Sequence, residues 1–124
     1  MITGIGLDII ETERVQQKIE KELGFRELVF SAEEIDYCEP KAHKYEHYAA
    51  RFAAKEAFLK ALGTGWLTGT SFNEIVILGD DAGKPEIHLQ GETANTLKHI
   101  DITKVKISLS HLKNIAAAVV IVES

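Results

Sequence analysis

The chain has 124 residues, enough for one domain with an ordinary core, and 45% of them are hydrophobic. Its net charge of −5 argues against non-specific binding to nucleic acid, which requires a basic surface. A single cysteine, Cys38, excludes an intramolecular disulfide framework and suits a reducing cytosol. The N-terminus lacks the pattern of a signal peptide, and the apolar run Ile115–Val122 is too short to cross a bilayer. We therefore expect one cytoplasmic domain over residues 1–124.

Residues 2–10 alternate in character with a period of two, which predicts a strand. One face carries Thr3, Ile5, Leu7 and Ile9, and the other carries Gly4, Gly6 and Asp8. Glycine inside a strand often marks the close approach of a ligand or of another backbone. Asp8 is therefore a polar group on a bare face, although an Asp at a strand end can also head a turn.

A helix is expected next, with Thr12 as its cap and Gly24 at its end. Its expected core positions are Val15, Ile19 and Leu23. A second, basic stripe consists of Arg14, Lys18 and Lys21. A helix surface of mixed charge is usually a solvated face.

Ser31 and Glu34 form a capping-box pattern, which predicts a short helix that ends before Pro40. Pro40 fits the first turn of a longer helix that runs to Leu62. The spacing of His43 and His47 in that helix could suit a metal, but no third ligand is spaced nearby. Exposed helix histidines are the simpler interpretation.

The segment Arg51–Gly65 is rich in helix-forming residues, and Gly63 lies where a helix C-terminus favours glycine. Its expected apolar face consists of Phe52, Leu59 and Leu62. Glu56 falls on the same face, where a carboxylate needs a cation, a metal or a proton. Alternatively, Glu56 forms a surface ion pair with Lys60, one turn further on.

The second half of the chain is mostly strand. The expected elements are strands at Ile75–Leu78 and Glu86–Leu89, a short helix at Gly91–Ile100, and strands at Lys104–His111 and Ile115–Val122. The last strand is apolar throughout, so it should be buried on both faces or lie in an interface. Because the helices form one block and most strands pair as hairpins, we predict an α+β fold with a largely antiparallel sheet and helices packed on it.

Asp8 and Glu56 come from distant elements, and each lies on a face where a charged side chain requires a partner. Mg²⁺ is typically held by one or two carboxylates, with phosphates and waters as the other ligands. A pair of carboxylates can also serve as the acid and base of a glycosidase. Lys55 and Lys60, followed by a Gly-Thr-Gly loop, favour a phosphate-bearing ligand. The residues alone thus indicate a candidate magnesium–phosphate site.

Three blocks of the chain resemble the signatures of the holo-[acyl-carrier-protein] synthase family, the small bacterial 4′-phosphopantetheinyl transferases. They are Gly-Ile-Gly-Leu-Asp-Ile-Ile-Glu at 4–11, the whole segment 51–65, and Ser-Leu-Ser-His at 108–111 followed by Ala-Ala-Ala-Val-Val at 116–120. Gly-Lys-Pro at 83–85 also resembles the hairpin of that family. The blocks occur in the family's order, and the resemblance covers essentially the whole chain.

The resemblance implies the fold of these transferases and a Mg²⁺-dependent reaction. In it, 4′-phosphopantetheine passes from coenzyme A to a serine of an apo acyl carrier protein, and adenosine 3′,5′-bisphosphate is released. This reaction supports fatty acid biosynthesis. The resemblance also implies a homotrimer whose active sites lie between neighbouring subunits.

Site residues follow from the matching positions. Asp8 and Glu56 match the metal ligands, and Lys60 matches the lysine near the pyrophosphate. Larger relatives carry a third acidic ligand where this chain has Ile10, so that a water takes its place. The implied coenzyme A site consists of Arg51, Lys60, Gly65, Pro85, Ser110 and His111, with His111 supplied by the neighbouring subunit. The implied carrier-docking residues are Arg14, Lys18 and Lys21.

Catalysis would combine Mg²⁺ and Lys60, which stabilise the charge of the leaving group, with a base that takes the serine proton. Glu56, or a metal-bound water that it orients, is the candidate base. Two other functions stay open on the sequence. One is a trimeric binder of coenzyme A or a nucleotide without transfer activity. The other is a glycosidase-like hydrolase, against which the basic surroundings and the lack of an aromatic sugar platform count.

Overall fold

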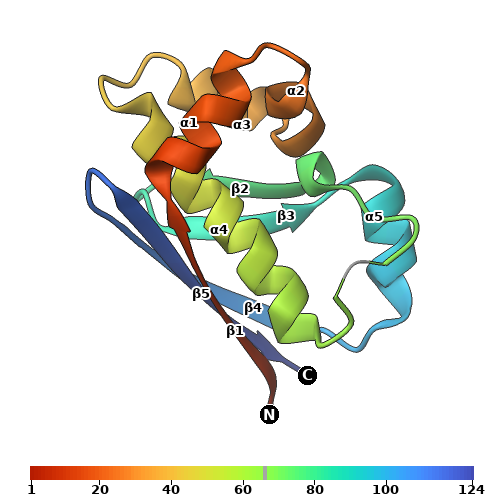
Figure 1. Ribbon diagram of the computed structural model, residues 1–124. Coiled ribbons are helices and arrows are strands. Elements are labelled where there is room, and N and C mark those ends of the chain that lie inside the picture. Colours follow the sequence, from red (N-terminus) through yellow and green to blue (C-terminus); the bar gives the residue numbers. More distant parts are fainter. Residues whose placement is uncertain (66) are drawn as a thin grey trace.

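The computed structural model describes residues 1–65 and 67–124, so Trp66, which we expect in a loop, lies outside the described residues (Figure 1). In chain order the elements are β1 (Ile2–Glu11), α1 (Thr12–Glu20), α2 (Phe25–Val29), α3 (Ala32–Cys38), α4 (Lys44–Leu62), η1 (Phe72–Glu74), β2 (Ile75–Gly79), β3 (Pro85–Leu89), α5 (Gly91–Thr96), η2 (Leu97–His99), β4 (Lys104–His111) and β5 (Ile115–Glu123). One antiparallel sheet has the order β1-β5-β4, and β2 and β3 form a second antiparallel pair. The predicted α+β fold is confirmed.

Helix α4 crosses one face of the three-stranded sheet, and α1, α2 and α3 gather around its N-terminal half (Figure 1). The approach of α4 to β1 is very close. A Cβ added to Gly4 would lie 1.9 Å from the carbonyl oxygen of Ala61, and one added to Gly6 would lie 1.8 Å from that of Ala57. The bare face of the first strand is therefore covered by the backbone of a helix, one of the two outcomes that glycine in a strand indicates.

Small side chains make this contact, rather than the large ones that the sequence suggested. The buried alanines at helical spacing are Ala49, Ala53, Ala57 and Ala61. Of the predicted apolar face, Leu59 is buried, whereas Phe52 and Leu62 are only partly buried. Alanine allows the helix to lie directly on the glycines of β1, so its carbonyl groups take the place of bulky side chains.

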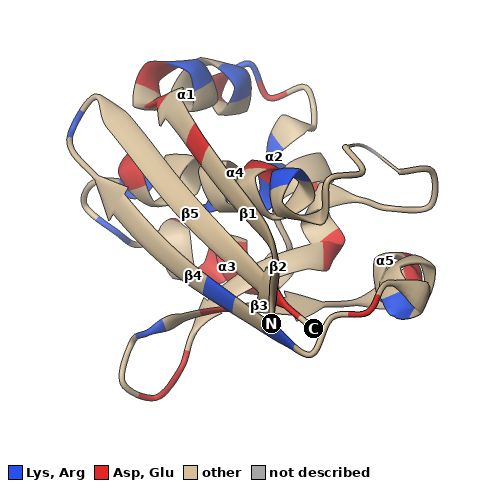
Figure 2. Ribbon diagram, turned by 90° about the horizontal axis from the view of Figure 1, so that it is seen from below, with Lys and Arg blue, Asp and Glu red and all other residues tan. Residues whose placement is uncertain are grey.

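The outer face of the same sheet is apolar and open in the single chain. Ile5, Leu7 and Ile9 are each about two-thirds exposed (66%, 65% and 67%). Opposite them in the register lie Ile121, Val119 and Ala117 of β5. The face seen in Figure 2 carries few charged residues along β1 and β5. The last strand is thus covered on one face by α4, while its other face continues an exposed apolar surface.

Three predictions for the first helix were wrong. Helix α1 ends at Glu20 because Glu22 and Gly24 take positive φ values (53° and 92°), which turn the chain into the unpredicted helix α2. Leu23 is consequently 84% exposed instead of buried. Thr12 is the first residue of α1 and not its cap, since the cap position is Glu11.

The long helix begins at Lys44 rather than at Pro40. The segment before it forms turns, and the amide of Lys41 donates to the carbonyl oxygen of Cys38 at 3.0 Å, which closes the chain back onto the end of α3. Among residues 1–65 and 67–124, we find no helix with the length and apolar character that a membrane crossing requires.

The capping box at the start of α3 is confirmed, and its acid has a second role. Glu34 accepts from the amide of Ser31 at 2.9 Å and from the amide of Ile77 at 3.0 Å. It also pairs with Lys55, whose Nζ lies 2.6 Å from Oε1 and donates to the carbonyl oxygen of Phe72 at 2.8 Å. This buried pair fastens α3 and α4 to β2. Lys55 is therefore a core residue, and our expectation that it favours a phosphate ligand was wrong.

Candidate functional site

Strand β1 and helix α4 bring Asp8 and Lys60 together at an accessible edge. The ammonium of Lys60 lies 3.0 Å from Oδ1 of Asp8 and donates to the carbonyl oxygen of Leu7 at 3.1 Å. The side chain of Lys60 is 54% exposed, and that of Asp8 is 16% exposed. Lys60 thus pairs with the strand aspartate and not with Glu56, its neighbour one turn back.

Glu56 is half-buried beside the same pair. Burial raises the pKa of its carboxyl group, and the negative charge of Asp8 raises the pKa further, while Lys60 and Lys18 act in the opposite direction. Two carboxylates that repel each other in a partly desolvated site favour a cation between them. The local electrostatics therefore support a metal site at Asp8 and Glu56.

The donor set decides which metal would suit this site. Within residues 1–65 and 67–124, no cluster of three or more His, Cys, Asp or Glu side chains could hold a metal. Two carboxylate groups are too few for a structural zinc site but match Mg²⁺, which takes one or two carboxylates and completes its shell with phosphates and waters. The residues present fit Mg²⁺ bound together with a phosphate-bearing substrate.

A second group of predicted residues lines a cleft of about 770 Å³ between α4, β4 and the β2–β3 hairpin. Its walls include Tyr37, His47, Arg51, Pro85, Ser108 and His111. Arg51 is buried, and its guanidinium carbon lies 4.2 Å from the centre of the Tyr37 ring. Its Nε is buried without a hydrogen-bond partner in the described part of the chain. A buried cationic donor of this kind is suited to an anionic ligand group.

The two groups lie on different sides of α4. Arg51 and Lys60 are separated by about two and a half helical turns, which places them on opposite faces of the helix. Gly65 follows the end of α4 with a φ of 62°, and Ser110 is exposed on β4 opposite Ala117; neither lines the cleft. The structure therefore brings together some of the predicted coenzyme A residues and separates others within one chain.

The basic stripe of α1 is exposed, as expected. Arg14 makes a long contact of 3.7 Å with Glu11. The ammonium of Lys18 lies 5.5 Å from the centre of the Phe25 ring and is close enough to Glu56 to act on its pKa. Lys18 thus brings one end of the stripe's charge close to the carboxylate pair.

Sequence reasoning missed two residues of the cleft wall, Tyr37 and His47, and one residue that contacts the wall from behind, Glu46. His47 is partly buried rather than exposed, and its ring packs against that of His111. Glu46 pairs with His111. The spacing of His47 and Arg51 by one helical turn was a signal for a shared face, but only the fold places β4 beside them.

Comparison with known proteins gives a consistent result. A family model described as the 4′-phosphopantetheinyl transferase superfamily matches residues 4–120. A protein of Cytophaga hutchinsonii named holo-[acyl-carrier-protein] synthase is 51% identical over 123 residues, which cover 98% of this chain and 97% of that protein.

Two solved structures are similar over nearly their whole length. The crystal structure of holo-[acyl-carrier-protein] synthase from Neisseria meningitidis has a TM-score of 0.90 and 34% identity, with all of both chains covered. That of a holo-(acyl-carrier-protein) synthase from Bacillus anthracis, in complex with CoA (3′,5′-ADP), has a TM-score of 0.82 and 36% identity and covers 100% of this chain and 98% of that one.

Proposed function

The chain belongs to the 4′-phosphopantetheinyl transferase superfamily as an enzyme of the holo-[acyl-carrier-protein] synthase type, and we propose that its reaction depends on Mg²⁺ held by Asp8 and Glu56. The serine of an apo acyl carrier protein attacks the β-phosphate of coenzyme A, and adenosine 3′,5′-bisphosphate leaves. The product, a holo carrier, serves fatty acid biosynthesis. The observation that carries this proposal is the carboxylate pair with an exposed lysine beside it.

Each of these side chains has a distinct task in the proposed reaction. Mg²⁺ at Asp8 and Glu56 would neutralise charge on the phosphates. Lys60 is mostly exposed, so its ammonium can exchange Asp8 for the phosphate of the leaving group and stabilise the charge that develops there. Glu56, whose pKa is raised by burial, is suited to accept the serine proton directly or through a water that it orients.

We further propose that the active enzyme is a homotrimer with shared sites. The open apolar face of β1 and β5 is a surface that favours burial against another copy of the chain. The Arg51–His111 cleft and the carboxylate pair lie on different sides of α4, so a neighbouring chain would bring one group to the other. Coenzyme A would then contact His111 of one subunit and Asp8 of the next.

Carrier docking is proposed for the exposed basic stripe Arg14, Lys18 and Lys21. An acidic carrier needs a basic landing site despite the net negative charge of the chain. The position of Lys18 near Glu56 supports this assignment, because a carrier bound there delivers its serine beside the carboxylates.

A transfer assay tests the function directly. The protein is incubated with coenzyme A, Mg²⁺ and an apo carrier, and the carrier is weighed by mass spectrometry. We expect the mass of one phosphopantetheine group to be added, whereas a non-catalytic binder of coenzyme A would leave the carrier unchanged. Asp8→Ala and Glu56→Gln should each remove most of the activity while the far-ultraviolet circular dichroism stays the same. Full activity in excess chelator would refute the metal assignment.

Mixed trimers test the shared site. Neither Glu56→Gln nor His111→Ala homotrimers should be fully active. After the two variants are unfolded together and reassembled, some sites contain both a wild-type Glu56 and a wild-type His111. The activity of the mixture should therefore exceed the sum of the activities of the two separate variants. Activity that stays at that sum, with mixed trimers confirmed by native mass spectrometry, would place both residues in one chain's site.

A further inference from the structure

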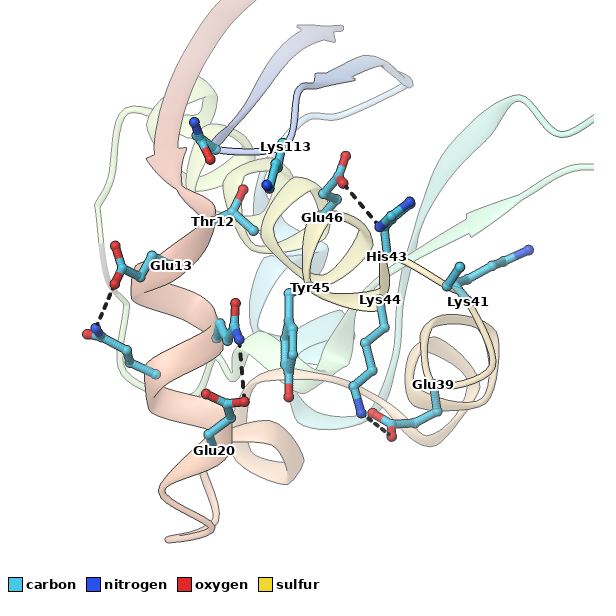
Figure 3. Close-up of a pocket in the computed structure, with 14 residues that line it drawn as sticks. Thr12, Glu13, Glu20, Glu39, Lys41, His43, Lys44, Tyr45, Glu46 and Lys113 are labelled. Atoms are coloured by element: carbon cyan, nitrogen blue, oxygen red, sulfur yellow. Dashed lines mark hydrogen bonds and ion pairs between the residues drawn. The ribbon is translucent and has the colours of Figure 1, made fainter.

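Glu46 lies in the first turn of α4 between two clefts. One is the cleft that contains Arg51 and His111. The other, of about 720 Å³, lies between α1, the start of α4 and the β4–β5 turn, and Glu46, His43 and Lys113 are on its wall (Figure 3). The side chain of Glu46 is only 17% exposed. A carboxylate so little exposed needs partners, and the structure supplies one from each side.

The stronger partner is His111 at the end of β4. Oε1 of Glu46 lies 2.9 Å from Nδ1 of the imidazole. A carboxylate can only accept hydrogen bonds, so this contact requires the proton on Nδ1 and leaves Nε2 as the ring nitrogen available to a ligand. The second oxygen of Glu46 lies 3.9 Å from Nδ1 of His43, a longer contact to a side chain that is 79% exposed (Figure 3).

The face of the His111 ring is held as well as its edge. The ring of His47 packs against it with 5.3 Å between centroids and an angle of 60°. The rings of His47 and Tyr37 meet in a T-shaped arrangement with 5.7 Å between centroids, and the guanidinium of Arg51 lies over the Tyr37 ring. His111 therefore belongs to a continuous row of rings along one wall of the cleft, and that row ends at the buried Nε of Arg51, which has no hydrogen-bond partner among residues 1–65 and 67–124.

We propose that Glu46 is a positioning residue of the coenzyme A site, which fixes the tautomer and orientation of His111 so that Nε2 faces coenzyme A. Glu46 itself does not touch the substrate. This role rests on the proposed function, in which His111 contacts coenzyme A. It differs from a helix-capping or folding role, because it acts only through the imidazole.

A double-mutant cycle in the transfer assay separates these roles. The variants are Glu46→Ala, His111→Ala and the pair together, with His43→Ala as the control that removes the other neighbour of Glu46. We expect Glu46→Ala to raise the KM for coenzyme A about tenfold, a change of roughly 1.4 kcal/mol, with kcat nearly unchanged. In the His111→Ala background the same substitution should have no further effect. His43→Ala should leave the KM at its wild-type value.

A conservative variant and a binding measurement complete the test. Glu46→Gln keeps a neutral oxygen that can accept from Nδ1, so it should recover most of the KM change. Titration calorimetry with coenzyme A, without carrier, should show the same order of affinities. Additive effects of the two alanine substitutions, or an equal loss in Glu46→Gln and Glu46→Ala, would overturn the positioning role. Wild-type protein that transfers nothing would instead overturn the proposed function, so the two failures are distinguishable.

Discussion

Two lysine–carboxylate pairs on α4, five positions apart, have the same chemistry and opposite surroundings. Both partners of the Lys55–Glu34 pair have completely buried side chains, and their atoms are 2.6 Å apart. In the Lys60–Asp8 pair the atoms are 3.0 Å apart, and the lysine side chain is 54% exposed. The first pair joins α4 to α3, and the second joins α4 to β1. The sequence gives no direct sign of this difference, since both lysines lie in the same helical block.

Their surroundings decide what each pair can do. Burial lowers the pKa of Lys55 to about 8, although the charge of Glu34 acts in the opposite direction. A buried charge of this kind is tolerated only because every partner is in place, so neither side chain can turn to a ligand. Lys60 remains in contact with water, and an exposed pair is worth at most about 1 kcal/mol, so a phosphate group can displace Asp8 at little cost. One pair stabilises the fold, and the other is available for function.

Removing the buried lysine should have the largest effect. Lys55→Ala leaves Glu34 buried without a cation and should lower the free energy of unfolding by about 3–5 kcal/mol, as breaking other buried pairs does. Urea denaturation measures this change. Lys60→Ala is the matched control on the same helix and should change the stability by less than about 1 kcal/mol.

A double variant distinguishes pairing from packing at this position. Lys55→Met with Glu34→Leu removes both charges and keeps similar volume, and it should recover much of the stability lost in Lys55→Ala. The recovery will be incomplete because the amides of Ser31 and Ile77 lose their acceptor. Equal stability of Lys55→Ala and wild-type protein would mean that the buried pair contributes nothing to the fold.

Replacing the exposed lysine should affect transfer activity much more than stability. Lys60→Ala should lower kcat roughly 10²–10³-fold, the usual loss when one group that stabilises developing charge is removed. Lys60→Arg keeps the charge and should retain more activity than Lys60→Ala. Wild-type kcat in Lys60→Ala would exclude the ammonium from the leaving-group site and leave it a surface partner of Asp8.

The sequence predicted the order and type of most elements because their signals are local. Period-two alternation identified β1, and the Ser31–Glu34 capping box identified the start of α3. The α4 segment was found by helix propensity and its terminal Gly63. Errors arose where local signals were weak or were overridden, as at Glu22, whose positive φ ends α1 early. No propensity rule anticipates a left-handed glutamate.

The candidate site was predicted unevenly. The residues on the matched motifs, Asp8 and Glu56, do lie near each other, and Lys60 pairs with Asp8. The role of Lys55 could not be deduced, because its partner Glu34 is 21 residues away and belongs to another helix. The contact between Glu46 and His111 was missed for the same reason, since it joins residues 65 positions apart. Such long-range pairs appear only after the fold has brought the elements together.

Reversing the exposed charges of α1 should have a moderate effect that depends on salt. Arg14→Glu with Lys18→Glu should raise the KM for an acidic carrier about tenfold at low ionic strength, with little effect on the KM for coenzyme A. The difference should shrink at higher salt, because exposed charges are screened over about 8–10 Å at 0.1–0.15 M. Unchanged carrier kinetics at low salt would mean that the stripe is only a solvated face.

The smallest expected effect is on the stability of a variant at Glu56, and it is a gain in stability instead of a loss. Burial and the charge of Asp8 raise the pKa of Glu56 in the folded state, so between the unfolded and folded pKa values the folded state holds a proton that the unfolded state has lost. Stability therefore falls as the pH rises through that window, and the loss persists at neutral pH. Glu56→Gln cannot ionise, so in chelator at pH 7 it should be more stable than wild-type protein, by at most about 1 kcal/mol.

Urea denaturation at two pH values and with or without Mg²⁺ checks this effect. At about pH 4, below the usual pKa of a glutamate, the difference should nearly vanish. At that pH the carboxyl group of Glu56 is mostly protonated in the folded state and in the unfolded state alike. Added Mg²⁺ should stabilise wild-type protein more than the variant, since a ligand that binds only the folded state raises its stability. Glu22→Gln, at an exposed position between α1 and α2, is the matched control and should leave the stability nearly unchanged. A variant less stable than wild type in chelator at pH 7 would show that Glu56 holds the fold together, as Glu34 does, instead of serving the site.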